Sequence, residues 1–294
     1  MTSIALIGPG AIGGTVGFAL LEKGHDVTVC ANQKFATLAL TRADTKERRA
    51  QPVTVVTSPA EASHADWVLL CVKSHQTDSA AGWLKALIGP HTRIAVLQNG
   101  VEHREHVAPY AGAGNAVVPV IVMLPAERTA PGEIMSYGGA SLTVADDAAG
   151  REFAALFAGT FVKAVTDTDF TSRAWEKLCM NAPSGALCAL TLNPAAIGAF
   201  PVLQPLATRL VEECMAVGRA EGAKFAGGFA KHIVGLFSHP TGRGNSMYFD
   251  RRDGKTLEWD ARNAVVSRLG ARHGIATPIS DTIVPLLRAL SPSA

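Results

Sequence analysis

The feature that most constrains the fold of this chain is a glycine-rich turn close to its first residue. Residues 3–8, SIALIG, form a short, continuous apolar run that ends in glycine, as a strand buried on both faces should. Gly8, Gly10 and Gly13 then complete a G-x-G-x-x-G pattern. In a dinucleotide-binding turn, the first glycine permits the tight turn, the second lets the backbone approach a pyrophosphate, and the third lets helix pack on strand.

The residues that follow the turn supply the rest of the expected motif. Residues 11–23 have a helical pattern that stops at Gly24, and DVTVC at 26–30 predicts a second strand. The helix N-terminus, at Ala11 and Ile12, offers backbone N–H groups to an anion. Strand, glycines, helix and second strand within ~30 residues favour a dinucleotide site over a turn that only packs.

The end of the second predicted strand indicates which dinucleotide is preferred. NAD enzymes of this type usually carry an acidic residue there, which binds the ribose 2′-hydroxyl. This chain has Asn32, Gln33 and Lys34, so no carboxylate repels a 2′-phosphate and one lysine is close by. We therefore expect NADP(H), with Asn32 and Lys34 near the phosphate. The alternative for Lys34 is a solvated position at the start of a surface helix.

Further strand-like runs alternate with helical patterns as far as residue 166, which predicts a doubly wound parallel sheet. The runs are residues 53–57, 66–72, 93–98, 115–123, 141–145 and 161–166. Ligands of such sheets bind beyond the carboxyl ends of the strands, and Lys73 and Asn99 follow two of these runs. Each residue taken alone fits an ordinary loop better than a site, but both in one sheet favour a cofactor and substrate site.

After Thr166 the strand patterns largely stop and helical periods take over. The predicted fold is therefore α/β: a Rossmann-type domain over residues 1–166, followed by an all-α domain over residues 167–294. In the first long helix of the second domain, three polar residues share one face, although apolar residues occupy other parts of the same turns. These polar residues are Lys177, Asn181 and Ser184.

Composition excludes several classes of function. The 294 residues carry a net charge of +2 and no basic run, which argues against a nucleic-acid partner. No run approaches the ~18 apolar residues that a membrane span needs, and the N-terminus lacks a signal-peptide pattern. The five cysteines are widely spaced without a zinc pattern and fit reduced core thiols. We expect a cytoplasmic enzyme or binding protein.

Six motifs together resemble the ketopantoate reductase (2-dehydropantoate 2-reductase) family along nearly the whole chain. The motifs are GPGAIGG at 8–14, VKSHQ at 72–76, QNG at 98–100, WEKLCMNA at 175–182, NSMYFD at 245–250 and TLEWDARN at 256–263. The resemblance implies a Rossmann domain, a helical domain, and NADPH-dependent reduction of a 2-oxo acid, ketopantoate to pantoate, in the cleft between them. It also implies a catalytic lysine at Lys177 and an active-site glutamate at Glu258.

The same resemblance implies the substrate contacts, which are Ser246 and Asn181, with Lys73 and Asn99 lining the site. The chemistry agrees with the residue types. A carbonyl reduced by hydride develops negative charge on oxygen, so a cationic donor such as Lys177 stabilises the transition state and supplies the proton. The structural alternative is an ion pair between Lys177 and Glu258 that only joins two helices.

The chain also departs from the family pattern. Asn32 stands where the family commonly has an arginine for the 2′-phosphate. Ser184 stands where the family has its second helical asparagine. A further asparagine of the family aligns near Ala195, and Asn193 of this chain is close by. Pro183 lies two residues before the usual proline, and an internal proline bends a helix. The reaction type is therefore better defined than the substrate.

Three other functions compete with ketopantoate reduction. The first is a reductase of another branched 2-oxo acid with a remodelled pocket. The second is a β-hydroxyacid dehydrogenase, which also uses a helix lysine, although the Glu258 and Ser246 motifs argue against it. The third is a non-catalytic NADP-binding sensor, which has no need of a proton donor such as Lys177. Oligomeric state is open, with a homodimer as the candidate assembly.

Overall fold

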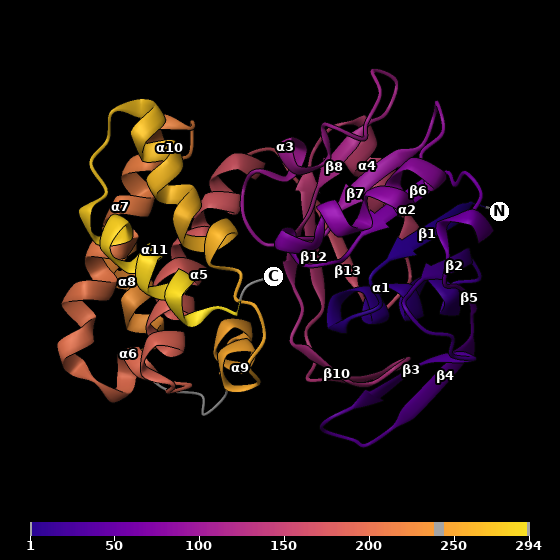
Figure 1. Cartoon of the computed structure of the whole chain (residues 1–294), viewed down its shortest axis with the longest axis horizontal. Helices are drawn as coiled ribbons and strands as arrows, with labels where there is room; N and C mark the ends of the chain where they lie inside the picture. Colours follow the sequence, from indigo (N-terminus) through magenta and orange to yellow (C-terminus); the bar gives the residue numbers. More distant parts are fainter. Residues whose placement is uncertain (1, 238–243, 293–294) are drawn as a thin grey trace. The chain divides into compact units, whose positions relative to one another are not determined.

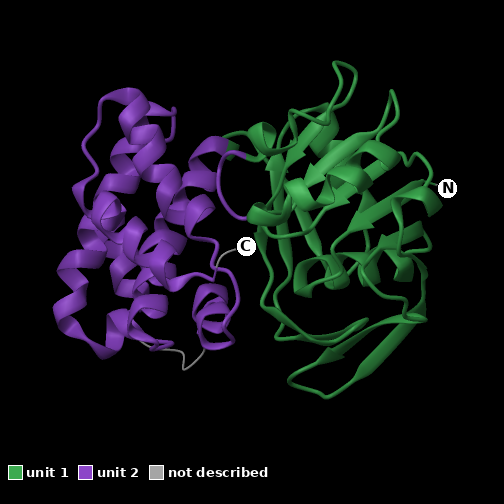
Figure 2. Ribbon diagram, viewed as in Figure 1, with its two compact units in different colours: residues 1–98, 103–170 green, residues 99–102, 171–294 purple. Residues whose placement is uncertain are grey.

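The computed structural model describes residues 2–237 and 244–292 of the chain. The chain divides into two compact units, coloured separately in Figure 2. Unit 1 comprises residues 1–98 and 103–170, and unit 2 comprises residues 99–102 and 171–294. All labelled strands lie in the N-terminal part of the chain, and the C-terminal part is helical (Figure 1). The short segment 99–102 belongs to the helical unit although it follows a strand of unit 1.

A six-stranded, all-parallel sheet forms the centre of unit 1. This is the predicted Rossmann-type sheet, in which ligands bind at the carboxyl edge where the strand order reverses. The order of its strands is β5 (Thr54–Val56), β2 (Asp26–Cys30), β1 (Ser3–Ile7), β6 (Trp67–Leu70), β7 (Arg93–Val96) and β8 (Val117–Pro119). The reversal lies between β1 and β6, the strands that precede the glycine-rich turn and Lys73.

The sheet is covered on both faces, which explains why its strands are largely apolar. Successive side chains of a strand point to opposite faces. Ile4 and Leu6 of β1 accordingly join one buried cluster, with residues of α1 (Ala11–Glu22) and α4 (Ala148–Leu156). Ala5 and Ile7 join another, with residues of α2 (Ala81–Leu87) and α3 (His103–Val107). Helices on both faces are the doubly wound arrangement predicted from the sequence.

Helix α1 is buried on nearly all sides because it also packs on a second sheet. Every residue from 13 to 20 is buried. A Cβ atom at Gly13 would lie 2.2 Å from the carbonyl oxygen of Gly8, and one at Gly14 would lie 2.4 Å from Ile134. Both distances are far inside van der Waals contact, so the two glycines let one helix pack closely against elements on two sides.

The second and third sheets correct two expectations from the sequence. The strand order of the second sheet is β10 (Ala126–Ala130), β11 (Glu133–Ser136), β3 (Thr37–Arg42) and β4 (Arg48–Pro52). Lys34 therefore precedes the β3–β4 hairpin, so the surface helix considered for it is wrong. The run at 115–123 is two strands rather than one, because β8 ends at Pro119 and β9 (Ile121–Met123) pairs in a third sheet.

The third sheet and several short helices complete unit 1. The sheet has the order β13 (Lys163–Asp167), β12 (Ser141–Ala145) and β9. Ser58 and Glu61 form a capping box at the start of a 3₁₀ turn. The 3₁₀ turns are η1 (Pro59–Glu61), η2 (Ser74–Gln76) and η3 (Asp78–Ala80).

Unit 2 is helical, and residues 171–237 and 244–292 contain no strand. Its elements are α5 (Phe170–Thr191), α6 (Ala196–Ala199), η4 (Pro201–Leu203), α7 (Gln204–Ala220), α8 (Phe229–Phe237), α9 (Ser246–Arg252), η5 (Asp260–Ala264), α10 (Val265–His273) and α11 (Pro278–Leu290). Helix α5 supplies Trp175, Leu178 and Cys179 to a core that also contains residues of α7 and α10. The helix continues through Pro183 to Thr191.

A buried carboxylate fastens α11 to α7. Glu213 accepts hydrogen bonds from the backbone N–H groups of Ile279 (2.7 Å) and Ser280 (2.8 Å), and from the Ser280 hydroxyl (2.7 Å). These donors belong to the first turn of α11, where backbone N–H groups have no partner within the helix and a negative charge is favourable.

We predict that Glu213→Gln destabilises the protein, because the amide nitrogen would face a backbone donor. The expected loss is about 2 kcal/mol or more in the free energy of unfolding. Urea unfolding followed by circular dichroism measures it. The exposed neighbour Glu212 gives the control, since Glu212→Gln should change the free energy by less than about 0.5 kcal/mol. Equal stability of the two variants would contradict the capping role.

Candidate active site

The glycine-rich turn has the geometry of an anion site at a helix N-terminus. Gly8 has φ +89°, and a Cβ atom there would lie 2.7 Å from the side chain of Val72, which follows β6. Gly10 precedes the first turn of α1, and a Cβ atom on it would meet no atom within 4 Å. The space in front of the helix is therefore open. The first turn, which includes Ala11, Ile12 and Gly13, contains no acidic residue that would repel an anion.

The residues predicted near a 2′-phosphate are exposed at the carboxyl end of β2. Asn32, Gln33 and Lys34 are all exposed. The Lys34 ammonium lies 3.6 Å from the carboxylate of Glu61, so its charge is partly compensated. Lys73 is half-buried after β6, and its backbone N–H donates to the Gln76 side chain (3.3 Å).

In unit 2, the polar face of α5 emerges from the core as the sequence spacing indicates. Lys177 and Asn181 are half-buried, whereas Leu178, Cys179 and Ala182 pack inside the core. Ser184 is buried, and its hydroxyl donates to the carbonyl oxygen of Met180 (2.7 Å). A serine hydroxyl has one proton, so this hydrogen bond removes Ser184 as a donor to a ligand.

A buried charge cluster surrounds Glu258. The side chains of Glu258 and Arg262 are 4% and 5% exposed, and their Oε2 and Nη2 atoms are 3.5 Å apart. The same Oε2 atom accepts a hydrogen bond from the side-chain amide of Asn99 (2.9 Å). Arg262 Nη2 also donates to the hydroxyl of Ser246 (2.7 Å). The structure thus brings three predicted site residues together around Arg262.

Lys177 is coupled electrostatically to the same cluster. Burial, as the main cause, and the positive charge of Arg262 together lower the pKa of Lys177 to about 8, although the negative charge of Glu258 opposes both. A lysine with a pKa near neutrality can give up a proton far more readily than a surface lysine. Strongly shifted titratable groups of this kind are typical of functional sites.

Two asparagines tie to α5 the segments that carry Glu258, Arg262 and Ser246. The Asn263 amide donates to the carbonyl oxygen of Ala182 (3.1 Å), which ties η5 to α5. The Asn245 amide donates to the carbonyl oxygen of Ser184 (2.8 Å), and its oxygen accepts from the Tyr248 N–H at the start of α9. Both anchors end on the helix that carries Lys177.

The segment 99–102 is held against η5 and α10. Gly100 has φ +107°, and a Cβ atom there would lie 3.0 Å from the carbonyl oxygen of Ala261. Glu102 forms an ion pair with Arg268 of α10 (2.5 Å). These contacts bring Asn99 to Glu258, although 159 positions separate them in the chain.

Sequence reasoning missed Arg262 as a functional candidate. It lies inside the TLEWDARN motif, and its spacing of four from Glu258 was the available signal. The element that carries it, η5, is a π-helix in which the N–H of Val265 bonds the carbonyl oxygen of Asp260. Single π-turns are rare and frequent at functional sites, and no residue pattern in this segment predicts one.

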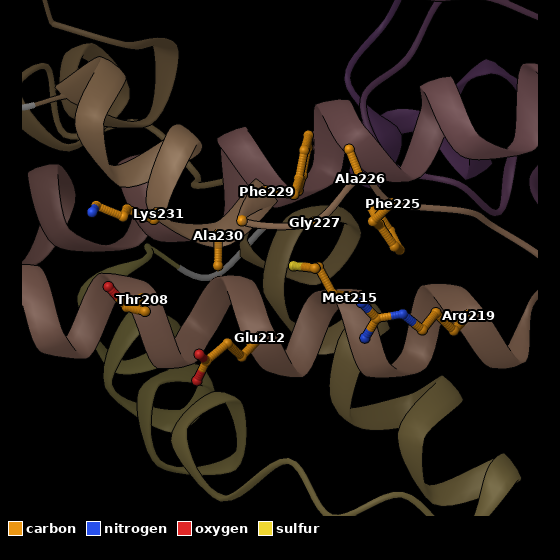
Figure 3. Close-up of a pocket in the computed structure, with 11 residues that line it drawn as sticks. Thr208, Glu212, Met215, Arg219, Phe225, Ala226, Gly227, Phe229, Ala230 and Lys231 are labelled. Atoms are coloured by element: carbon orange, nitrogen blue, oxygen red, sulfur yellow. The ribbon is translucent and has the colours of Figure 1, made fainter.

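Other features of the described residues give weaker evidence for a functional site. A hollow of about 460 Å³ lies between α7 and the segment 225–231 (Figure 3), and contains none of the predicted site residues. Within residues 2–237 and 244–292, no group of His, Cys, Asp and Glu could hold a metal ion, and no helix has the length and apolar character of a membrane span. The five cysteines are free thiols, and burial raises the pKa of Cys30 to about 12.

Comparison with known proteins agrees with the fold and the motifs. The family model for ketopantoate reductase PanE/ApbA matches residues 4–148, and the model for its C-terminal part matches residues 169–291. The chain belongs to the ketopantoate reductase family. A 2-dehydropantoate 2-reductase of Caulobacter vibrioides is 44% identical to it and covers 98% of this chain and 99% of its own. One of Mycobacterium tuberculosis is 41% identical, with 99% and 98% covered.

Solved structures of this family share the fold of both units. The 2-dehydropantoate 2-reductase of Geobacter metallireducens has a TM-score of 0.90 at 27% identity, and covers 98% of this chain and all of its own. A ketopantoate reductase of Staphylococcus aureus, described as dimeric, has a TM-score of 0.87 at 26% identity, with 98% of each chain covered. The chain is thus an oxidoreductase-family protein along its full length.

The open space at Gly10 predicts a variant that folds but does not bind a dinucleotide. Gly10→Val should leave the melting temperature nearly unchanged, since the new side chain meets no protein atom. It should weaken binding of a nicotinamide dinucleotide at least ~100-fold, because the side chain would occupy the place of the pyrophosphate. Fluorescence titration measures the affinity. Gly13→Val is the contrasting variant, and should unfold at lower temperature. Retained binding by folded Gly10→Val would refute the assignment.

Proposed function

We propose that this protein catalyses the NADP(H)-dependent reduction of a 2-oxo acid, and that the main substrate is 2-dehydropantoate, reduced to pantoate. The names of the relatives from Caulobacter vibrioides and Mycobacterium tuberculosis support the substrate. The observation that carries the proposal is the half-buried Lys177, whose pKa is lowered to about 8 beside Glu258 and Arg262. A packing ion pair does not require a lysine poised to lose its proton.

The residues of the glycine-rich turn fit the proposed cofactor. Gly8, Gly10 and Gly13 form a turn with open space at the N-terminus of α1, and the N–H groups of Ala11 and Ile12 lie in the first turn of that helix. Lys73 follows the neighbouring strand β6 and is the proposed cation at the same edge of the sheet. When bound, the reduced nicotinamide supplies a hydride for the carbonyl carbon.

Lys177 is the proposed general acid. Negative charge develops on the carbonyl oxygen during reduction, and the ammonium both stabilises this charge and transfers a proton to it. The product is then a neutral hydroxyl beside a neutral amine, and the amine regains its proton from solvent. A lowered pKa suits this role, since the best catalytic pKa lies close to the working pH.

The neighbours of Lys177 have complementary roles in the proposal. Glu258 favours the protonated form of Lys177, because its charge opposes the effects of burial and of Arg262 on the pKa. Asn99, hydrogen-bonded to Glu258, keeps that carboxylate in place. Asn181, one helical turn after Lys177, is the proposed contact to the substrate ketone or hydroxyl. Ser246 is the proposed donor to the substrate carboxylate.

A second candidate is a reductase of other branched 2-oxo acids. The Ser184 hydroxyl donates to Met180, and this supports the alternative, because a ligand then finds no donor at that place on α5. A site with fewer polar contacts discriminates less between analogues. Similar kcat/KM values for several branched 2-oxo acids would favour it over ketopantoate.

The assembly and cellular location are further parts of the proposal. The Staphylococcus aureus relative is described as dimeric, which supports a homodimer for this chain. A cytoplasmic location stays a prediction from the sequence.

We predict that Lys177→Ala lowers kcat for ketopantoate by at least ~10³-fold, since it removes both the proton donor and the charge at the oxyanion. NADP(H) affinity should change little, because the glycine-rich turn belongs to unit 1. Steady-state kinetics and cofactor titration provide the measurements. Lys231→Ala, which changes an exposed lysine of α8, is the control. The lysine is structural if Lys177→Ala keeps more than about a tenth of kcat with every 2-oxo acid tried.

The pH profile of the wild type gives an independent check of the same role. A general acid acts in its protonated form, so activity should be present below the pKa of Lys177 and lost as the pH rises past about 8. A rate that stays constant to pH 10 would exclude Lys177 as the acid.

We predict a modest NADP(H) preference that an added cation enlarges. Asn32 is exposed after β2 and Lys34 is paired with Glu61, so the 2′-phosphate meets little uncompensated positive charge. Asn32→Arg should raise the ratio of NADPH to NADH affinity about tenfold, because a guanidinium binds phosphate in a fork. Asn32→Ala is the control and should leave the ratio nearly unchanged. A wild type that prefers NADH would overturn the cofactor proposal.

A further inference from the structure

The charge cluster of unit 2 brings two cations, Lys177 and Arg262, near the carboxylate of Glu258. The positive charge of Arg262 lowers the pKa of Lys177, and the negative charge of Glu258 raises it. Burial of a charge is costly unless an opposite charge or hydrogen bonds compensate it. The Glu258 carboxylate is a weak partner of Arg262, because its Oε2 atom is 3.5 Å from Nη2 and already accepts from Asn99 at 2.9 Å. The guanidinium of Arg262 is therefore suited to receive a second anion.

Arg262 has donors left for that anion. Its Nη2 atom serves Ser246 and Glu258. Among the described residues, Nε is buried and has no hydrogen-bond partner, and no hydrogen bond of Nη1 is present. A guanidinium carries five N–H donors in a planar fork that matches the two oxygens of a carboxylate. A buried side chain with unused donors is costly on its own, and a bound carboxylate relieves that cost.

The position of Arg262 is central among the proposed substrate contacts. Its Nη1 atom lies 3.7 Å from the place of a Cβ atom on Gly185, so the guanidinium approaches α5 one turn beyond Asn181. Because Ser246 accepts from Arg262, the serine hydroxyl keeps its own proton for a ligand. Arg262 and Ser246 can thus donate together to one carboxylate.

We propose that Arg262 is a specificity-determining residue that binds the carboxylate of the substrate, and that it selects 2-oxo acids over neutral 2-oxo compounds. The inference rests on the proposed function. It adds a contact and a selection rule: the enzyme recognises the acid group of its substrate through a buried guanidinium, with Ser246 as the second donor.

The test compares one substrate in charged and neutral form. Ketopantoate and its neutral internal ester, ketopantoyl lactone, share the carbonyl to be reduced. The ratio of their kcat/KM values does not depend on the fraction of folded enzyme. It is measured for the wild type, Arg262→Gln, Arg262→Lys and Arg272→Gln, where Arg272 is an exposed residue of α10. Loss of a buried charged hydrogen-bond partner weakens recognition strongly.

We expect Arg262→Gln to lower the ratio of kcat/KM for ketopantoate to kcat/KM for the lactone roughly 10²-fold or more, beyond any loss that both substrates share through Lys177 and Glu258. Arg262→Lys should restore part of the preference for the acid over the lactone, because lysine keeps the positive charge but lacks the paired N–H donors of a guanidinium. Arg272→Gln should match the wild type.

Two results overturn the inference. In the first, acid and lactone lose activity by the same factor in Arg262→Gln, as expected of a residue that only positions Glu258 or Lys177. In the second, the preference for the acid survives in both Arg262 variants. A wild type that reduces no 2-oxo acid would instead overturn the proposed function, and the inference with it.

Discussion

The arrangement of unit 2 depends on compensating a charge that is buried among helices. Arg262 and Glu258 are almost fully buried, and each needs partners that α5 alone does not supply. The partners come from three separate stretches of chain: Asn99 from the segment after β7, Ser246 from the start of α9, and Lys177 from α5. The backbone anchors of Asn245 and Asn263 on α5 hold these stretches in register. Packing and electrostatics therefore favour the same arrangement of helices.

In unit 1, helix α1 both packs against two sheets and presents its N-terminus to open space. One helix lies against the parallel sheet on one side and against the β3–β11 pair on another, and glycines at 13 and 14 remove the side chains that would keep them apart. The same helix presents its N-terminus to open space at Gly10. A helix that is buried on most sides is rigid, and rigidity suits a backbone site whose N–H groups must point at one anion.

Much of this organisation could be predicted from the sequence, because it follows local patterns. The turn at Gly8, the apolar strand β1 and the helical period of α5 each need only neighbouring residues, and the structure confirms all three. The hairpin at 37–52 was missed, because its strands are half polar and because β3 also pairs with a strand distant in the sequence, β11. Arg262 was missed for a similar reason. The functional role of Arg262 depends on its proximity to Ser246 and Lys177, which arises only in the folded unit.

The path of the chain at residues 99–102 makes the helical unit dependent on the N-terminal half of the sequence. The segment leaves β7, contributes Asn99 and Glu102 to contacts with Glu258 and Arg268, and returns to unit 1 at His103. A single cut near residue 170 therefore cannot yield a complete helical unit. For the same reason, exchange of the C-terminal half between relatives would join one protein's glutamate to another's asparagine. The contacts around Glu258 and Arg268 would then depend on residues taken from both proteins.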